Sequence, residues 1–331
     1  MSRSRCVWLI AALYCAACSR QSGPVVVATD VPEMLARPML NEFGTDRGVT
    51  VDRRSVNDAD ADLVWSRDPE AALQLAARHA LAALPGGDYG RPASMIDPAR
   101  GWIATSAIAR VLVYDPARIA DDDVPTKTLE LSRPAVGPRL VLADPTHGAA
   151  AWQAAALVGA LGEGPGLEFY RALLTNGALV VGDEDAVAAH LQSGDRALAL
   201  TDSDRALALQ EQRPNLVISF PDQEADGAGV FVLPAVVGLT ARGAGNPAAG
   251  ALLDFLVSAP VTRRLAMTAN AILVLNDAAE EPAGLLSIGR LRVMPVSYAD
   301  VAARLPATRA ALSRLHSGAL TQRGDASDLG A

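Results

Sequence analysis

Residues 142–157 read LADPTHGAAAWQAAAL, and this stretch decides the fold class. The apolar run Leu140–Ala143 is typical of a strand buried in a parallel sheet. Pro145 and Gly148 mark a tight turn, and the alanine-rich segment after them predicts a helix. The backbone N–H groups at such a helix start attract anions; the alternative is an ordinary structural turn.

The same alternation of strand and helix runs outward in both directions. Strands are predicted at 25–28, 49–51, 62–65, 178–181 and 197–200, and helices at 32–43, 69–83, 149–161, 165–175, 184–193, 247–257, 259–267 and 299–315. Two longer β-rich stretches, Trp102–Tyr114 and Val230–Leu239, divide the chain into thirds. Long strands that pass between two sheets form a hinge, so we expect two α/β lobes with a ligand cleft between them.

The first 24 residues have the pattern of an export signal. Arg3 and Arg5 precede eleven apolar residues, VWLIAALYCAA (7–17), which are too few to span a bilayer. Small residues followed by Cys18 resemble a bacterial lipoprotein signal, although Cys15 stands where leucine is usual. We expect a signal peptide at 1–17, lipidation of Cys18, a tether at 18–24, and a lipid-anchored protein of the periplasm or cell envelope. A plain secretory signal is the alternative and leaves export unchanged.

Composition excludes several functions. All three cysteines, Cys6, Cys15 and Cys18, lie in the export signal, so none remains for a disulfide, a metal site or a nucleophile. The net charge of −8 does not suit nucleic acid, and we expect contact with membranes only through the lipid anchor. The four histidines lack metal-ligand spacing and Ser106 lacks a nucleophile elbow, so we expect no enzyme activity.

The order and wording of several segments resemble one family. The matching phrases are VVVATDVPEMLARPMLNEFGTDRGVTV (25–51), ADLVWSRDPEAAL (61–73), WIATSAIARVLVYDPARI (102–119), LADPTHGAAAWQAAALVGALG (142–162), YRALLTNGALVV (170–181), GDRALALTDSDRAL (194–207) and NPAAGALLDFLVSAPVTRRLA (246–266). From about Val25 to about Asn276 the chain resembles the periplasmic solute-binding proteins of ABC importers, specifically the ferric-ion type.

This resemblance implies the type II periplasmic-binding-protein fold, with parallel or mixed sheets flanked by helices. Lobe 1 would hold 25–105 plus about 230–275, and lobe 2 would hold 106–229 plus about 276–317. The small and polar residues of 318–331 independently predict a flexible tail. The resemblance also implies a monomer that gives its ligand to an inner-membrane ABC permease. No cofactor is expected, although a metal ion such as Fe³⁺ could be bound as ligand.

The metal half of the family's ligand set is altered. Ser203 and Asp204 occupy the place of the twin tyrosines, and Arg67 stands where a carboxylate is expected. An arginine cannot ligate a metal. A ferric site of the usual kind is therefore not expected, and the candidate substitutes are Asp204, Asp30 and Asp68.

The anion half of the set is better kept. By resemblance, an anion would be held at Thr146, His147, Gly148 and Ala149, with Asn176 donating to it. Arg110 matches one of two arginines in the family's hinge strand. Across the cleft we expect Arg67, Asp202, Ser203 and Asp204.

We therefore predict an exported solute-binding protein that closes on a small anion or a metal–anion complex, iron(III)-type by resemblance. The alternative is a degenerate homologue that acts as an envelope sensor or partner-binding lipoprotein without transport.

Overall fold

The computed structural model describes residues 23–268, 273–275 and 286–328. The predicted signal peptide, Cys18 and most of the predicted tether lie outside the described residues. No helix within the described ranges has the length and apolar character needed to cross a membrane.

One continuous path of paired strands runs through the molecule. Its order is β2 (Val51–Arg54), β1 (Val25–Thr29), β3 (Leu63–Ser66), β9 (Val232–Leu239), β4 (Ile103–Tyr114), β7 (Leu198–Asp202), β5 (Leu140–Ala143) and β6 (Leu179–Val181), with β8 (Val217–Ser219) also on β4. Pairs within each end of the path are parallel, and the pairs that involve β4 or β9 are antiparallel. The sheet is therefore mixed, as expected.

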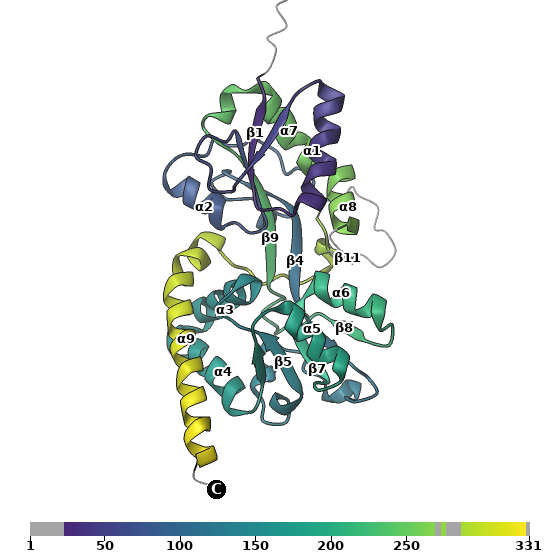
Figure 1. The fold of residues 1–331 in the computed structure, drawn as a ribbon, viewed down its shortest axis with the longest axis vertical. Helices are drawn as coiled ribbons and strands as arrows, with labels where there is room; N and C mark the ends of the chain where they lie inside the picture. The colour runs from purple at the N-terminus through teal and green to yellow at the C-terminus, as the bar shows by residue number, and fades with distance from the viewer. Residues whose placement is uncertain (1–22, 269–272, 276–285, 329–331) are drawn as a thin grey trace, which may run out of the picture.

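The two long strands connect the halves of the molecule. β4 pairs with β9 along Ile103–Ala109, then with β7 along Arg110–Tyr114 and with β8 along Leu112–Tyr114. A register shift between Ala104 and Ser106 interrupts the first of these pairings. Figure 1 shows β4 and β9 crossing from one half to the other. This confirms the predicted α/β fold with two lobes joined by crossover strands.

Helices cover the strands of both lobes (Figure 1). The upper lobe carries α1 (Glu33–Arg47), α2 (Glu70–Ala77), α7 (Pro247–Val257) and α8 (Ala259–Thr268). The lower lobe carries α3 (Gly148–Leu161), α4 (Glu163–Thr175), α5 (Glu184–Ser193), α6 (Ser203–Gln212) and α9 (Tyr298–Asp328). Helix α6 and the short strands β8, β10 (Leu273–Val274) and β11 (Leu286–Ser287) were not expected from the sequence. Helix α9 continues past residue 318, where the sequence predicts a tail; the domain boundaries stay predictions.

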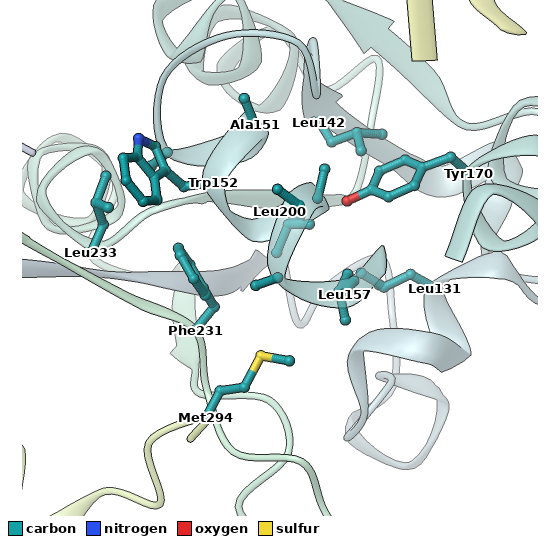
Figure 2. Close-up of a cluster of buried hydrophobic side chains, with 14 of the residues drawn as sticks. Leu131, Leu142, Ala151, Trp152, Leu157, Tyr170, Leu200, Phe231, Leu233 and Met294 are labelled. Carbon is teal, nitrogen blue, oxygen red and sulfur yellow. The ribbon is translucent and has the colours of Figure 1, made fainter. Parts of the chain in front are cut away.

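Helix α3 lies in the core of the lower lobe, because every residue of Ala149–Val158 is buried. A helix that is apolar on all sides needs cover all round, and α3 packs against α4 and α9. Figure 2 shows Trp152 and Leu157 of this helix among side chains from other elements, including Leu142, Tyr170 and Phe231. The start of α3 is therefore held in a fixed position.

Candidate functional site

A cavity of about 400 Å³ lies between the lobes, lined by residues of both lobes and of the two crossover strands. The lining begins where parallel strands end: Val31 follows β1, Arg67 follows β3, Asp144 follows β5 and Asp202 ends β7. In α/β sheets, ligands bind at the carboxyl ends of the strands, because loops there can present side chains without disturbing the sheet. We call this cavity the cleft.

The start of α3 lines the cleft through His147, Gly148 and Ala149. Gly148 has a φ of +53°, which favours glycine, and a Cβ there would meet nothing within 4 Å. The first intrahelical bond is donated by the N–H of Ala151 to the carbonyl of His147 (3.0 Å), so the preceding amides have no acceptor within the helix. Among described residues, no side chain caps this helix. These amides can therefore donate to an anionic group.

Carboxylates dominate the rest of the lower wall of the cleft. They belong to Asp144, Asp183, Glu184, Asp185, Asp202 and Asp204, and Asp68 adds another from the upper lobe. Arg67 and Arg205 are the arginines of the lining. Arg205 lies 3.2 Å from Asp185, so part of its charge is already neutralised. The cleft is therefore negative overall.

Arg110 forms a buried network behind this wall. Its guanidinium is 1% exposed and donates to Glu184, to Asp202 (2.5 Å) and to the side-chain oxygen of Gln153 (3.3 Å). Thr201 donates its hydroxyl to the second oxygen of Glu184 (2.5 Å). The network joins α3, β4, α5 and β7. Arg110 thus holds two carboxylates in place and is not part of the cleft lining.

Burial and mutual repulsion raise the pKa of three carboxyl groups that line the cleft. Burial raises the pKa of Asp202 to about 7; Arg110 opposes the rise, and Glu184 and Asp204 add to it. Burial likewise raises the pKa of Asp204 and the pKa of Asp68. Each of these groups is ionised at a cost that a nearby positive charge would reduce.

Seven of the sequence-predicted site residues lie together in the cleft. They are Arg67, Asp68, His147, Gly148, Ala149, Asp202 and Asp204. Their role in ligand binding stays a prediction.

The other predicted residues, Arg110 included, lie outside the cleft lining and have structural partners. Thr146 directs its hydroxyl to Asp144 (2.7 Å), and the amide of Asn176 donates to the carbonyl of Ser132 (2.6 Å). The hydroxyl of Ser203 accepts from the N–H of Ala109 (3.0 Å), and Asp30 accepts from the N–H of Arg67 (2.8 Å).

The three aspartates proposed as substitute metal ligands do not all meet in the cleft: Asp68 and Asp204 line it, and Asp30 is outside its lining. Within the described ranges, no group of three or more His, Cys, Asp or Glu side chains has an arrangement that could hold a metal ion. The described tyrosines are also outside the cleft lining. The described residues therefore do not form a direct iron site.

Sequence reasoning missed Asp144, Asp183–Asp185 and Arg205 as lining residues. Asp144 directly follows the predicted strand 140–143, and Asp183–Asp185 come shortly after the predicted strand 178–181. Their position at strand ends was the available signal. Arg205 lies in α6, the helix that was not expected.

A family model of bacterial extracellular solute-binding proteins matches residues 47–267, more than half of the chain. The chain belongs to this family. No curated protein sequence matches this solute-binding protein at a significant level.

Three solved structures illustrate the likeness in fold. Iron-bound HitA from Pseudomonas aeruginosa has a TM-score of 0.74 at 16% identity, covering 88% of this chain and 99% of HitA. Apo FutA2 from Synechocystis PCC6803 has a TM-score of 0.75 at 18% identity, covering 89% and 99%. AfuA from Actinobacillus pleuropneumoniae, with exogenous fructose-6-phosphate bound, has a TM-score of 0.66 at 15% identity, covering 86% and 96%. These identities support the fold and not a ligand.

The family settles the class of function. This solute-binding protein is a ligand-binding component of the type that serves ABC importers, and the family places it in the periplasm. Proteins of the family are typically not enzymes. The comparisons do not favour the alternative of an envelope sensor without transport.

Proposed function

We propose that this protein binds, in the cleft, a small ligand that carries an anionic group, and delivers it to an inner-membrane permease. The observation that carries the proposal is the uncapped start of α3 at Gly148 and Ala149, inside a cavity shared by both lobes. The donors there are backbone amides on a helix whose own packing fixes their direction.

Hinge closure would couple binding to delivery. Gly148 belongs to the lower lobe and Arg67 to the upper lobe, and β4 and β9 are the only long connections in the described sheet. A ligand that contacts both residues stabilises the closed arrangement by its extra affinity for that arrangement. A permease can then distinguish the loaded protein from the empty one by the relative position of its lobes.

An iron ligand would have to bind through its anions. The described residues provide no set of carboxylates and phenolates for direct coordination of Fe³⁺. A metal–anion complex would therefore place its anion at the start of α3. We further propose that Cys18 carries a lipid and that the protein acts as a monomer.

A thermal-shift experiment on the chain from residue 19 onward tests the proposal. The probes are phosphate, ethyl phosphate, phosphoethanolamine, arginine and Fe(III)–citrate. At least one should raise the unfolding temperature, because a ligand that binds only the native state stabilises it. Failure of all five probes would contradict the proposal.

A pair of glycine variants locates the anion. Gly148→Ala places a methyl group in the cleft, at a backbone φ of +53°. Gly194→Ala is the matched control, since Gly194 has a φ of +80°, ends α5 and is outside the cleft lining. Both variants should lose about 1–2 kcal/mol of stability. Only Gly148→Ala should weaken binding of the probe; equal affinity in both variants would contradict the anion site.

A further inference from the structure

We propose that the ligand of this cleft is an organic molecule with a protonated amine, which the carboxylates of the cleft bind opposite the anion site. The inference rests on the proposed function, since the cleft is identified as a ligand site by the fold and the family. The composition of its walls then determines the class of ligand.

The first step is the negative charge that forms no ion pair within the described protein, although Arg67 and Arg205 are near enough to act electrostatically on Asp68 and Asp204. Arg110 is committed to Glu184 and Asp202, and Arg205 is paired with Asp185. Asp204 and Asp68 form no ion pair with any other described residue; each accepts a hydrogen bond from a nearby backbone N–H, of Arg205 and Glu70 respectively. These two carboxylates belong to opposite lobes.

The second step is the location of these two carboxylates. Asp204 is in the first turn of α6, and Asp68 lies just before α2, so each is presented by the start of a helix. Both are partly buried and both line the cleft. A cation placed between them would join the two lobes, which is the contact that closure requires.

The third step is the choice between a metal ion and an organic cation. Direct metal binding lacks its ligand set among the described residues. The cleft also has an apolar wall, which includes Leu35, Ile108, Leu233 and Leu265. Apolar side chains gain nothing from a hydrated ion but can cover a carbon skeleton, and a volume near 400 Å³ is in the usual range for organic ligands.

The fourth step concerns anions. A ligand with negative charge alone would meet the amides of Gly148 and Ala149, but it would also face seven carboxylates, of which Arg110 and Arg205 pair with only three. A molecule with both charges avoids this conflict, because its anionic group can lie at the start of α3 and its amine between Asp68 and Asp204. Ammonium groups donate several hydrogen bonds and match carboxylate acceptors.

Binding of matched probes tests the inference. The amine probes are phosphoethanolamine and arginine, each of which also carries an anionic group; the probes without an amine are ethyl phosphate, phosphate and Fe(III)–citrate. We expect at least one amine probe to bind more tightly than every probe without an amine. Asp204→Asn should weaken that binding at least about tenfold, because a hydrogen bond to a charged group is lost. Asp254→Asn, on the exposed face of α7, is the control and should bind as wild type does.

The outcomes separate the two proposals. Binding of phosphate, ethyl phosphate or Fe(III)–citrate with no binding of the amines would overturn the amine inference and leave the proposed function standing. Equal affinity of the amine probe for both variants would also overturn it. Absence of binding by all five probes would overturn the proposed function and the inference together.

Discussion

Replacement of Arg110 by methionine should strongly destabilise the lower lobe. The substitution keeps much of the side-chain volume and removes the charge that Glu184 and Asp202 share. Breaking a buried ion pair by removal of one partner costs about 3–5 kcal/mol. The two carboxyl side chains are 16% and 14% exposed, so some water reaches them and the lower end of this range applies. We expect a loss of about 3 kcal/mol.

Urea unfolding measures this loss, with Arg171→Met as control. Arg171 pairs with Glu168 on the surface of α4, where both side chains are more than half exposed. Such a pair contributes about 0–1 kcal/mol, so the control should unfold close to wild type. A loss for Arg110→Met no larger than that of the control would refute the described network.

The pH dependence of the same variant is a second, independent result. Without Arg110, the pKa of Asp202 should rise further above its ordinary value, because the charge that opposes the effect of burial is gone. The native state then binds protons that the unfolded chain has released, so its stability grows as the pH falls. The deficit of Arg110→Met should therefore shrink between pH 8 and pH 5, and a deficit independent of pH would contradict the reasoning.

Three further predictions concern single residues. Burial raises the pKa of Asp202 to about 7 from its ordinary value of 3.8. Between these two pH values the native state holds a proton that the unfolded chain has released, so the stability that this group contributes falls as the pH rises. Asp202→Asn should thus gain stability relative to wild type from pH 5 to pH 8, measured by urea unfolding; a constant difference would contradict this. Asn176→Ala should cost about 1 kcal/mol of stability, because the hydrogen bond from Asn176 to the carbonyl of Ser132 is lost. The affinity for the probe, measured by calorimetry, should not change, and a loss of affinity would indicate that Asn176 takes part in ligand binding. Cys18→Ser should release the protein from envelope membranes into the soluble periplasmic fraction, and membrane retention of this variant would argue against lipidation.

Local patterns predicted most of the fold. The crossover strands were recognisable as long β-rich stretches, and α3 followed from a strand, a turn and an alanine run. Helix α6 was missed because it begins at Ser203, immediately after β7, without a Pro or Gly turn to mark the change. Strand β8 has only three residues, too few to show a pattern.

The site was less predictable because side-chain direction depends on tertiary packing. The start of α3 could be placed from the turn that precedes it. The resemblance to a family suggested ligand roles for Arg110, Asn176 and Ser203, yet their partners come from strands and loops distant in sequence. The acidic wall arises from separate strand ends that only the folded sheet brings together.

A distance across the cleft tests hinge closure most directly. The three natural cysteines all lie in residues 1–18, so the chain from residue 19 accepts two spin labels without competition. Met34 of α1, which is 81% exposed, and Glu211 of α6, which is also exposed, are suitable sites in opposite lobes. We predict that the probe giving the largest thermal shift shortens the distance between labels at these positions. An unchanged distance with the probe fully bound would contradict closure of the two lobes around a ligand.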